Sequence, residues 1–189
     1  MSKLYMMRHG QTLFNVLKRK QGWCDSPLTE LGIEQAKRAG EELRERGITF
    51  DHAYSSTSER ACDTLELVVP GMPYERVKGL KEWNFGKFEG ITEDLNLTPP
   101  FGDFYVQFGG RTRWSSVTAC SPPSPSLCVA RTRERLMVSP RRRVRAISSC
   151  VRRRVTERLG RRIGNCGIFI YEFDGDSGFE LLDAINPNE

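Results

Sequence analysis

Three segments near the N-terminus of this 189-residue chain predict an α/β fold. The run Leu4–Met7 is short and apolar, as in a buried strand. Residues 29–47 carry apolar positions at helical spacing, and residues 50–56 again have the composition of a strand. A strand, a helix and a second strand in this order are typical of a sheet with helices packed against it.

The first strand ends at residues that suit an anionic ligand. In an open α/β sheet, ligands bind at the carboxyl ends of the strands. Arg8 offers a fork of donors that fits phosphate, and His9 is a nitrogen nucleophile that is uncharged over much of the physiological range. Gly10 lets a ligand approach the backbone, while Thr12 and Asn15 add neutral hydrogen-bonding groups. The stretch predicts a site for a phosphorylated substrate.

The next elements are predicted from their first residues. Thr29 can cap the helix that continues to about Gly47, and the expected role of that helix is to pack against the core. The strand of residues 50–56 leads into a second helix, which brings Arg60 to the ligand-binding edge of the sheet. His52, the only other histidine, falls inside the strand and away from that edge, so we interpret it as structural.

A longer motif surrounds these residues. It comprises Arg-His-Gly-Gln-Thr-x-x-Asn from residue 8, Gln21-Gly22, and Asp25-Ser26-Pro27-Leu28-Thr29-x-x-Gly32-x-x-Gln35-Ala36. The motif resembles the histidine phosphatase superfamily, also called phosphoglycerate mutase-like, and the resemblance covers most of residues 3–110 and returns near the C-terminus. It implies a single domain over residues 1–189, folded as a three-layer α/β/α sandwich with a mainly parallel central sheet. It also implies phosphoryl transfer from a small phosphomonoester through a phosphohistidine.

The resemblance assigns roles to individual residues. His9 would attack phosphorus, and Arg8 and Arg60 would neutralise the phosphoryl oxygens. Glu82, in the motif Leu-x-Glu-x-x-Phe-Gly-x-x-Glu-Gly, would protonate the leaving group, because burial beside aromatic side chains favours the protonated acid. Glu89 of the same motif is interpreted as structural. The residues expected to bind the substrate are Arg8, Gly10, Gln11, Thr12, Asn15, Gln21, Gly22 and Arg60.

Several classes of protein are disfavoured by composition. No apolar run approaches the roughly 20 residues of a membrane span, and no signal peptide opens the chain, so a cytoplasmic location is expected. The six cysteines lack metal-ligand spacing and are expected to be reduced thiols. No metal or organic cofactor is expected, since arginines supply the positive charge. A phosphatase is favoured over a mutase because the chain is shorter than the cofactor-dependent phosphoglycerate mutases. The sequence does not predict the oligomeric state.

Residues 111–162 differ from the rest of the chain and are called the Arg-rich segment below. They hold 15 arginines, no lysine and two acidic residues, a net charge of +13, whereas the remaining residues carry −8. The resemblance implies Gly-Gly-Glu at its start and a later strand that ends at a second catalytic histidine in a His-Gly context. The chain has Arg111 in place of the glutamate, and no histidine follows His52.

Three interpretations of the Arg-rich segment compete. A nucleic-acid-binding element would explain the charge, but Trp114 is its only aromatic residue. A disordered basic insertion suits the Ser-Pro stretch of residues 121–126. Translation in the wrong phase is the third: one base forward, the codons of Arg111 and Thr112 permit Glu, and those of residues 140–144 permit His-Gly-Gly-Ala. Because sequence with 15 arginines and several prolines replaces the strand and helix that the resemblance implies, we expect the segment to disrupt the sheet, to bury no comparable apolar face and to lower both stability and activity.

Overall fold

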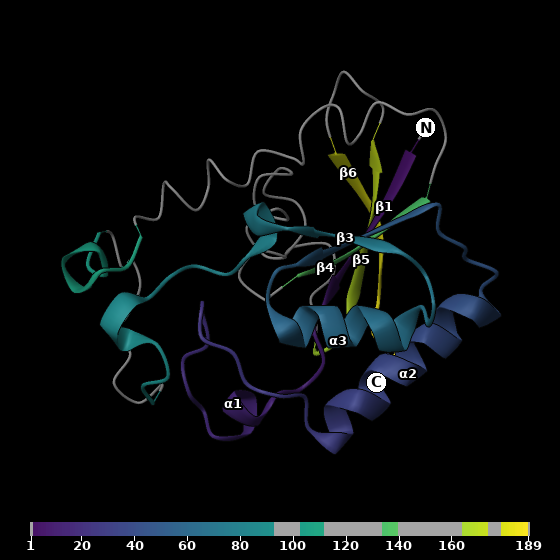
Figure 1. The fold of residues 1–189 in the computed structure, drawn as a ribbon. Coiled ribbons are helices and arrows are strands. Elements are labelled where there is room, and N and C mark those ends of the chain that lie inside the picture. Colours follow the sequence, from purple (N-terminus) through teal and green to yellow (C-terminus); the bar gives the residue numbers. More distant parts are fainter. Residues whose placement is uncertain (1, 93–102, 112–133, 140–163, 174–178, 189) are drawn as a thin grey trace.

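The computed structural model describes residues 2–92, 103–111, 134–139, 164–173 and 179–188 (Figure 1). Six strands form one sheet in the order β3-β2-β4-β1-β5-β6. Their bounds are β1 Ser2–Arg8, β2 His52–Ser56, β3 Tyr74–Val77, β4 Glu134–Ser139, β5 Ile168–Phe173 and β6 Phe179–Ile185. The first four strands pair in parallel, whereas β5 is antiparallel to both β1 and β6. The predicted α/β fold with a mainly parallel sheet is confirmed.

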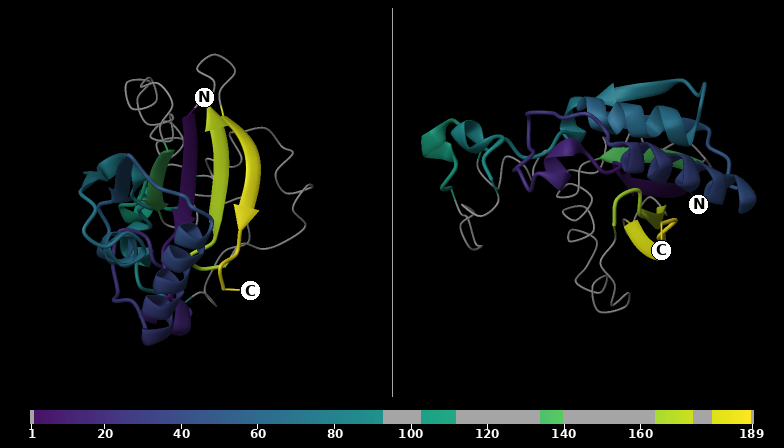
Figure 2. Two further views of the ribbon diagram at one scale, coloured as in Figure 1. Left: turned by 90° about the vertical axis from the view of Figure 1, so that its right-hand side faces the viewer. Right: turned by 90° about the horizontal axis from the view of Figure 1, so that it is seen from below.

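Two longer helices cover one face of this sheet (Figure 2). They are α2 Glu30–Glu45 and α3 Glu59–Val68. Thr29 caps α2 as predicted, since its hydroxyl accepts a hydrogen bond from the Gly32 amide at 3.0 Å. The helices approach closely, because a Cβ at Gly40 would lie 2.5 Å from the Val68 carbonyl oxygen. The expected helical layer on the opposite face falls on residues outside the described ranges.

The loops contain short helices. They are α1 Leu13–Val16, η1 Lys78–Leu80, η2 Gly86–Phe88 and η4 Val106–Phe108. All lie in segments that link strands of the sheet, and α1 follows the short loop after β1 that contains His9. Among the residues described, none of the helices has the length and apolarity that crossing a bilayer requires.

Strand β4 lies at the centre of the sheet, between β1 and β2. Leu136 and Val138 pack into the core beneath the helices, and Met137 packs on the opposite face, as the alternation of side chains in a strand requires. All three side chains are at most 1% exposed. For residues 136–138, this corrects the expectation that the Arg-rich segment would disrupt the sheet and bury no comparable apolar face. Three adjacent apolar residues suffice for a short buried strand, and the average composition of the segment concealed them. Residues 112–133 and 140–163 of that segment lie outside the described residues.

Candidate active site

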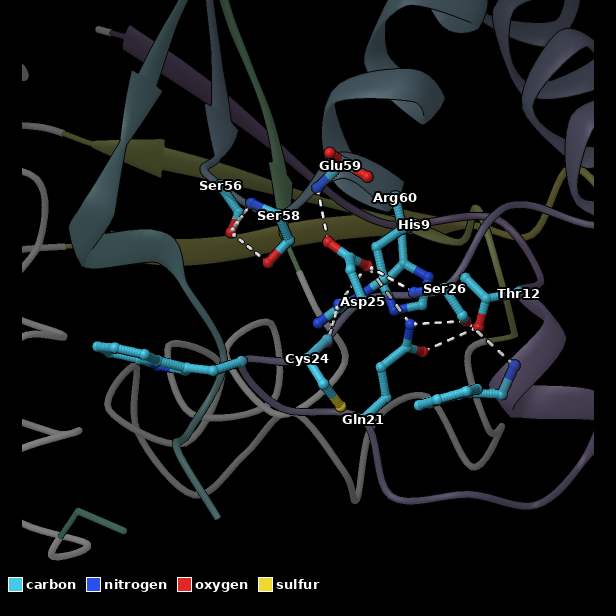
Figure 3. A network of polar contacts seen from close by, with 12 residues as sticks. His9, Thr12, Gln21, Cys24, Asp25, Ser26, Ser56, Ser58, Glu59 and Arg60 are labelled. Carbon is cyan, nitrogen blue, oxygen red and sulfur yellow. Dashed lines mark hydrogen bonds and ion pairs between the residues drawn. The ribbon is translucent and has the colours of Figure 1, made fainter. Parts of the chain in front are cut away.

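The carboxyl ends of β1 and β2 bring the two main predicted residues together. His9 follows β1, and Arg60 lies in the first turn of α3, which begins shortly after β2. Both side chains are almost inaccessible to solvent, at 4% exposed for His9 and 0% for Arg60. Figure 3 shows them side by side. His52 lies at the other end of β2, as predicted.

The hydrogen bonding of His9 fixes which ring nitrogen is reactive. Nδ1 lies 2.7 Å from the Gly10 carbonyl oxygen, which can only accept, so Nδ1 donates. The neutral ring therefore carries its lone pair on Nε2. Burial lowers the pKa of His9 well below its usual value, and the charges of Arg60 and Arg8 lower it further. The result is a buried imidazole that is neutral at physiological pH and has its lone pair on Nε2.

Gly10 and Thr64 connect the His9 loop to α3. The Gly10 amide donates to the Thr64 hydroxyl at 3.0 Å, and that hydroxyl donates to the Arg60 carbonyl at 2.6 Å. A Cβ at position 10 would lie 2.5 Å from the Gly32 carbonyl oxygen, so only glycine fits there. Thr64 was not predicted as a site residue. Its spacing of four residues from Arg60, one helical turn, was the available signal.

The Arg60 guanidinium is held by acceptors from a single loop. Nη1 donates to the Asp25 carboxylate at 2.7 Å and to the Cys24 carbonyl at 3.2 Å, and Nη2 donates to the Gly22 carbonyl at 3.1 Å. Nε is buried and has no hydrogen-bond partner within the described part of the chain. An anionic ligand could supply the acceptor that this buried donor lacks.

Asp25 explains how a buried arginine can occupy the first turn of a helix, where the helix dipole disfavours a cation. Its carboxylate also accepts a hydrogen bond at 2.6 Å from the backbone amide of Glu59, the first residue of α3 (Figure 3). One carboxylate thus caps the helix and compensates the charge of Arg60. Asp25 belongs to the family-like motif, but the resemblance had assigned it no role.

The expected binding residues around α1 form a polar network. Thr12 and Asn15 cap α1 reciprocally, with Thr12 accepting from the Asn15 amide and Asn15 accepting from the Thr12 amide. The Thr12 hydroxyl donates to the Gln21 side chain at 2.8 Å, and Gln21 donates to Ser26 Oγ at 3.0 Å. Asn165, just before β5, donates to Asn15 Oδ1 at 3.2 Å. This contact between distant parts of the sequence was not predicted.

Gln11 faces the start of α2. Its amide donates to Gln35 Oε1 at 3.0 Å, and its side-chain oxygen accepts from the Thr29 hydroxyl at 2.8 Å. These bonds fix the loop that carries His9 to the helix that covers the sheet.

Glu82 is buried in an aromatic environment, at 4% exposed, with Trp83 and Phe85 also buried. Its carboxylate accepts a hydrogen bond from the Trp83 amide at 2.9 Å, and its carbonyl accepts from the Trp23 indole at 3.0 Å. The second bond joins the Glu82 loop to the loop that binds Arg60. Within the described ranges, no group of three or more His, Cys, Asp or Glu side chains is placed to hold a metal ion.

Comparison with known proteins places these features in a family context. Residues 4–116, more than half of the chain, match the model of the histidine phosphatase superfamily (branch 1). A 2,3-bisphosphoglycerate-dependent phosphoglycerate mutase from Bradyrhizobium sp. (strain BTAi1 / ATCC BAA-1182) is 40% identical over 96 residues, which are 48% of this chain and 46% of the relative. The chain spans about half the length of the curated relatives it matches.

Solved structures extend the similarity in fold. Bacillus stearothermophilus YhfR has a TM-score of 0.80 at 26% identity, over 96% of this chain and 95% of that one. Phosphoserine phosphatase from Entamoeba histolytica, in complex with 3-phosphoglyceric acid, has a TM-score of 0.73 at 26% identity, over 97% and 96% of the two chains. The likeness in fold therefore continues beyond residue 116, where the match to the family model ends.

Proposed function

Because the chain belongs to the histidine phosphatase superfamily, we propose that it transfers a phosphoryl group from a small phosphomonoester to Nε2 of His9 and then to water. One observation carries the proposal. The His9 ring is buried, it donates from Nδ1 to Gly10, and the charges of Arg60 and Arg8 keep it neutral. It can therefore attack phosphorus without first losing a proton.

The first step forms the bond between Nε2 and phosphorus while the ester oxygen leaves. Arg8 and Arg60 neutralise the phosphoryl oxygens, and the buried Nε of Arg60 donates to one of them. Glu82 gives its proton to the leaving alkoxide. The Nδ1–H···O=C bond to Gly10 stabilises the positive charge that develops on the ring.

The second step returns the phosphoryl group to water. Glu82, now a carboxylate, takes a proton from the attacking water, the bond from Nε2 to phosphorus breaks, and inorganic phosphate leaves. The network of Thr12, Asn15 and Gln21 holds the loop beside His9 in one arrangement, so that these groups can position the substrate. The Gly10 and Gly22 amides, also expected to bind substrate, donate instead to Thr64 and Glu89 and so shape the loops around the site. No metal or organic cofactor takes part in this scheme.

The substrate class follows from the chemistry of the site. Two buried or partly buried arginines and a nitrogen nucleophile suit a phosphomonoester, and related proteins are named for phosphoserine and phosphoglycerate. We propose hydrolysis rather than isomerisation, in a single cytoplasmic domain. The nucleic-acid-binding alternative receives no support from the comparisons, and most of the Arg-rich segment lies outside the described residues.

The second catalytic histidine is missing from this scheme. Arg8 pairs with Ser139 at the end of the β1–β4 ladder, and the next position in the sequence after Ser139 is where the resemblance would require the second histidine. That position is Pro140, the first of the residues whose codons permit His-Gly in the shifted phase, and it lies outside the described residues. Losing one preorganised donor costs about 10²–10³ in turnover, so we propose that the chain retains phosphate binding but has low activity.

Rapid-quench trapping tests the proposed function. With a phosphomonoester labelled on phosphorus, we expect an acid-labile, base-stable phosphoprotein that disappears in His9→Ala. His52→Ala removes the only other histidine and serves as the matched control, which should label like the wild type. Labelling that persists in His9→Ala would exclude His9 as the nucleophile.

A further inference from the structure

We propose that Glu89 is a positioning residue, which holds Arg60 in place through the three residues of the segment 22–24. The proposal rests on the proposed function only in treating Arg60 as a phosphate ligand. Glu89 and Arg60 have no hydrogen bond to each other among the contacts of the described residues, so any influence of Glu89 must pass through this segment.

The Glu89 carboxylate accepts hydrogen bonds from all three backbone amides of the segment 22–24. Its Oε2 accepts from the Gly22 amide at 3.1 Å and the Cys24 amide at 3.0 Å, and its Oε1 accepts from the Trp23 amide at 2.9 Å. Three consecutive backbone N–H groups thus converge on one carboxylate. Such a cluster of amides is a strong anion site, and here a side chain of the same protein occupies it.

The Arg60 guanidinium donates hydrogen bonds to two backbone carbonyls of the same segment. Nη2 donates to the Gly22 carbonyl at 3.1 Å, and Nη1 donates to the Cys24 carbonyl at 3.2 Å. Gly22 and Cys24 therefore each donate to an anion and accept from a cation. Hydrogen bonds linked in this way polarise one another, so loss of the anion weakens the hold on the cation.

The close fit of Gly22 shows that the segment is pressed against Glu89. A Cβ at position 22 would lie 2.4 Å from Glu89 Oε1 and 2.3 Å from the Trp83 carbonyl oxygen. No side chain larger than that of glycine can be placed there without displacing the carboxylate or the backbone. This close fit agrees with the hydrogen bonds in placing the segment 22–24 directly against the Glu89 carboxylate.

The same carboxylate also fixes the loop of the proposed proton donor. Glu89 Oε1 accepts from the Phe85 amide at 2.8 Å, three residues after Glu82, and the Trp23 indole donates to the Glu82 carbonyl at 3.0 Å. Glu89 therefore sets the position of the phosphate-binding cation and of the proton donor relative to one another. Glu89 was interpreted from the sequence as structural, and these hydrogen bonds add a role in positioning the two proposed functional groups.

Substitution by glutamine should loosen the segment, because the amide has one accepting oxygen and its NH₂ group would face N–H donors. Arg60 would then lose its two carbonyl partners while keeping its ion pair with Asp25, and we expect it to lie farther from His9. The charged groups that face His9 are Arg60 on α3 and Arg8 at the end of β1, and both lower its pKa. Moving Arg60 away raises the pKa of His9, whereas the direct loss of the negative charge on Glu89 would lower it. The direction in which the pKa of His9 changes therefore distinguishes movement of Arg60 from the direct loss of the charge on Glu89.

The experiment follows the two histidine rings by NMR through a pH titration, without substrate, and then measures the affinity for inorganic phosphate. In Glu89→Gln we expect a higher pKa for His9 and about tenfold weaker phosphate binding, the equivalent of one lost charge-assisted hydrogen bond. Glu42→Gln, which breaks an exposed ion pair with Arg46 on α2, is the matched control and should change neither. An unchanged or lower pKa for His9 in folded Glu89→Gln would overturn the proposal.

A double-mutant cycle separates positioning from general loosening. Arg60→Met alone should raise the pKa of His9, and adding Glu89→Gln should raise it no further, because the group through which Glu89 acts is gone. Additive shifts would overturn the proposal. If Glu89→Gln does not fold, Glu89→Asp, which keeps the charge but reaches fewer amides, should shift His9 in the same direction. Neither measurement needs turnover, so failure of the phosphoenzyme test leaves this result intact.

Discussion

Strands β1 and β4 are parallel neighbours at the centre of the sheet, yet they end differently. Both bury adjacent apolar residues on the two faces of the sheet, and Tyr5 and Met6 pair with Leu136 and Met137. β1 continues into His9, whereas the sequence after β4 continues with Pro140. The fold needs only apolar side chains at the right period, while the chemistry needs one particular residue at the strand end. β4 therefore occupies its place in the sheet although the histidine that the family resemblance implies is absent from the sequence.

The largest expected effect concerns the end of β4. If the coding DNA is read one base forward between the codons for Gly110 and Ile163, we expect an uninterrupted open frame that encodes His-Gly. The protein made from that frame should hydrolyse a phosphomonoester about 10²–10³ times faster than the chain as written, the factor for one preorganised donor. Steady-state kinetics on both proteins makes the comparison. Stop codons in that phase, with ordinary turnover by the chain as written, would contradict the out-of-phase hypothesis.

The next prediction tests whether β4 supports the fold as β1 does. Leu136→Ala removes a fully buried side chain of β4, the strand between β1 and β2, and we expect a loss of about 2–5 kcal/mol in the free energy of unfolding. Met6→Ala in β1 should cost a similar amount. Leu182→Ala, on an exposed position of β6, is the control and should change stability by less than about 0.5 kcal/mol. Urea denaturation measures all three, and a small effect of Leu136→Ala would show that β4 contributes little.

The sequence predicted the elements whose signals are local. The cap at Thr29, the helix that follows it and the approach of Arg60 to His9 all depend on spacing within a few residues or on the rule for strand ends. The position of β4 was missed because its partners in β1 and β2 are far away in the sequence. Three apolar residues inside an Arg-rich segment gave no periodicity from which that pairing could be inferred.

In the candidate site, too, features with a local sequence signal were predicted and contacts between distant segments were not. Residues in the motif were identified, but the motif does not say which of them touch each other. The pairing of Asp25 with Arg60, and the contact of Asn165 with Asn15, join loops whose relative positions are set only by the finished sheet. Glu89 could be recognised as part of a motif, while its four amide partners could not.

A smaller effect on the free energy of unfolding is expected at the hydrogen bond that joins the loop after β1 to α3. Thr64→Val removes the only acceptor that the described contacts give to the Gly10 amide, and leaving a buried donor unpaired costs about 1–3 kcal/mol. Thr64→Ser keeps the hydroxyl and should retain most of the stability. Urea denaturation of both variants makes the test, and equal losses in the two would assign the effect to packing rather than to the hydrogen bond.

The smallest expected effect is the pH dependence that His9 adds to the stability of the β1 end. Its pKa in the folded protein lies well below the usual 6.5, so between these values the unfolded chain binds a proton that the folded chain does not. The stability is complete above about pH 6.5 and falls on acidification towards the folded pKa, by at most about 1.4 kcal/mol per pH unit. His9→Asn removes this dependence while keeping a donor for the Gly10 carbonyl. Denaturation of the wild type, His9→Asn and the matched control His52→Asn between about pH 7.5 and 5.5 measures it. A difference between wild type and His9→Asn that stays constant over that range would contradict a neutral His9.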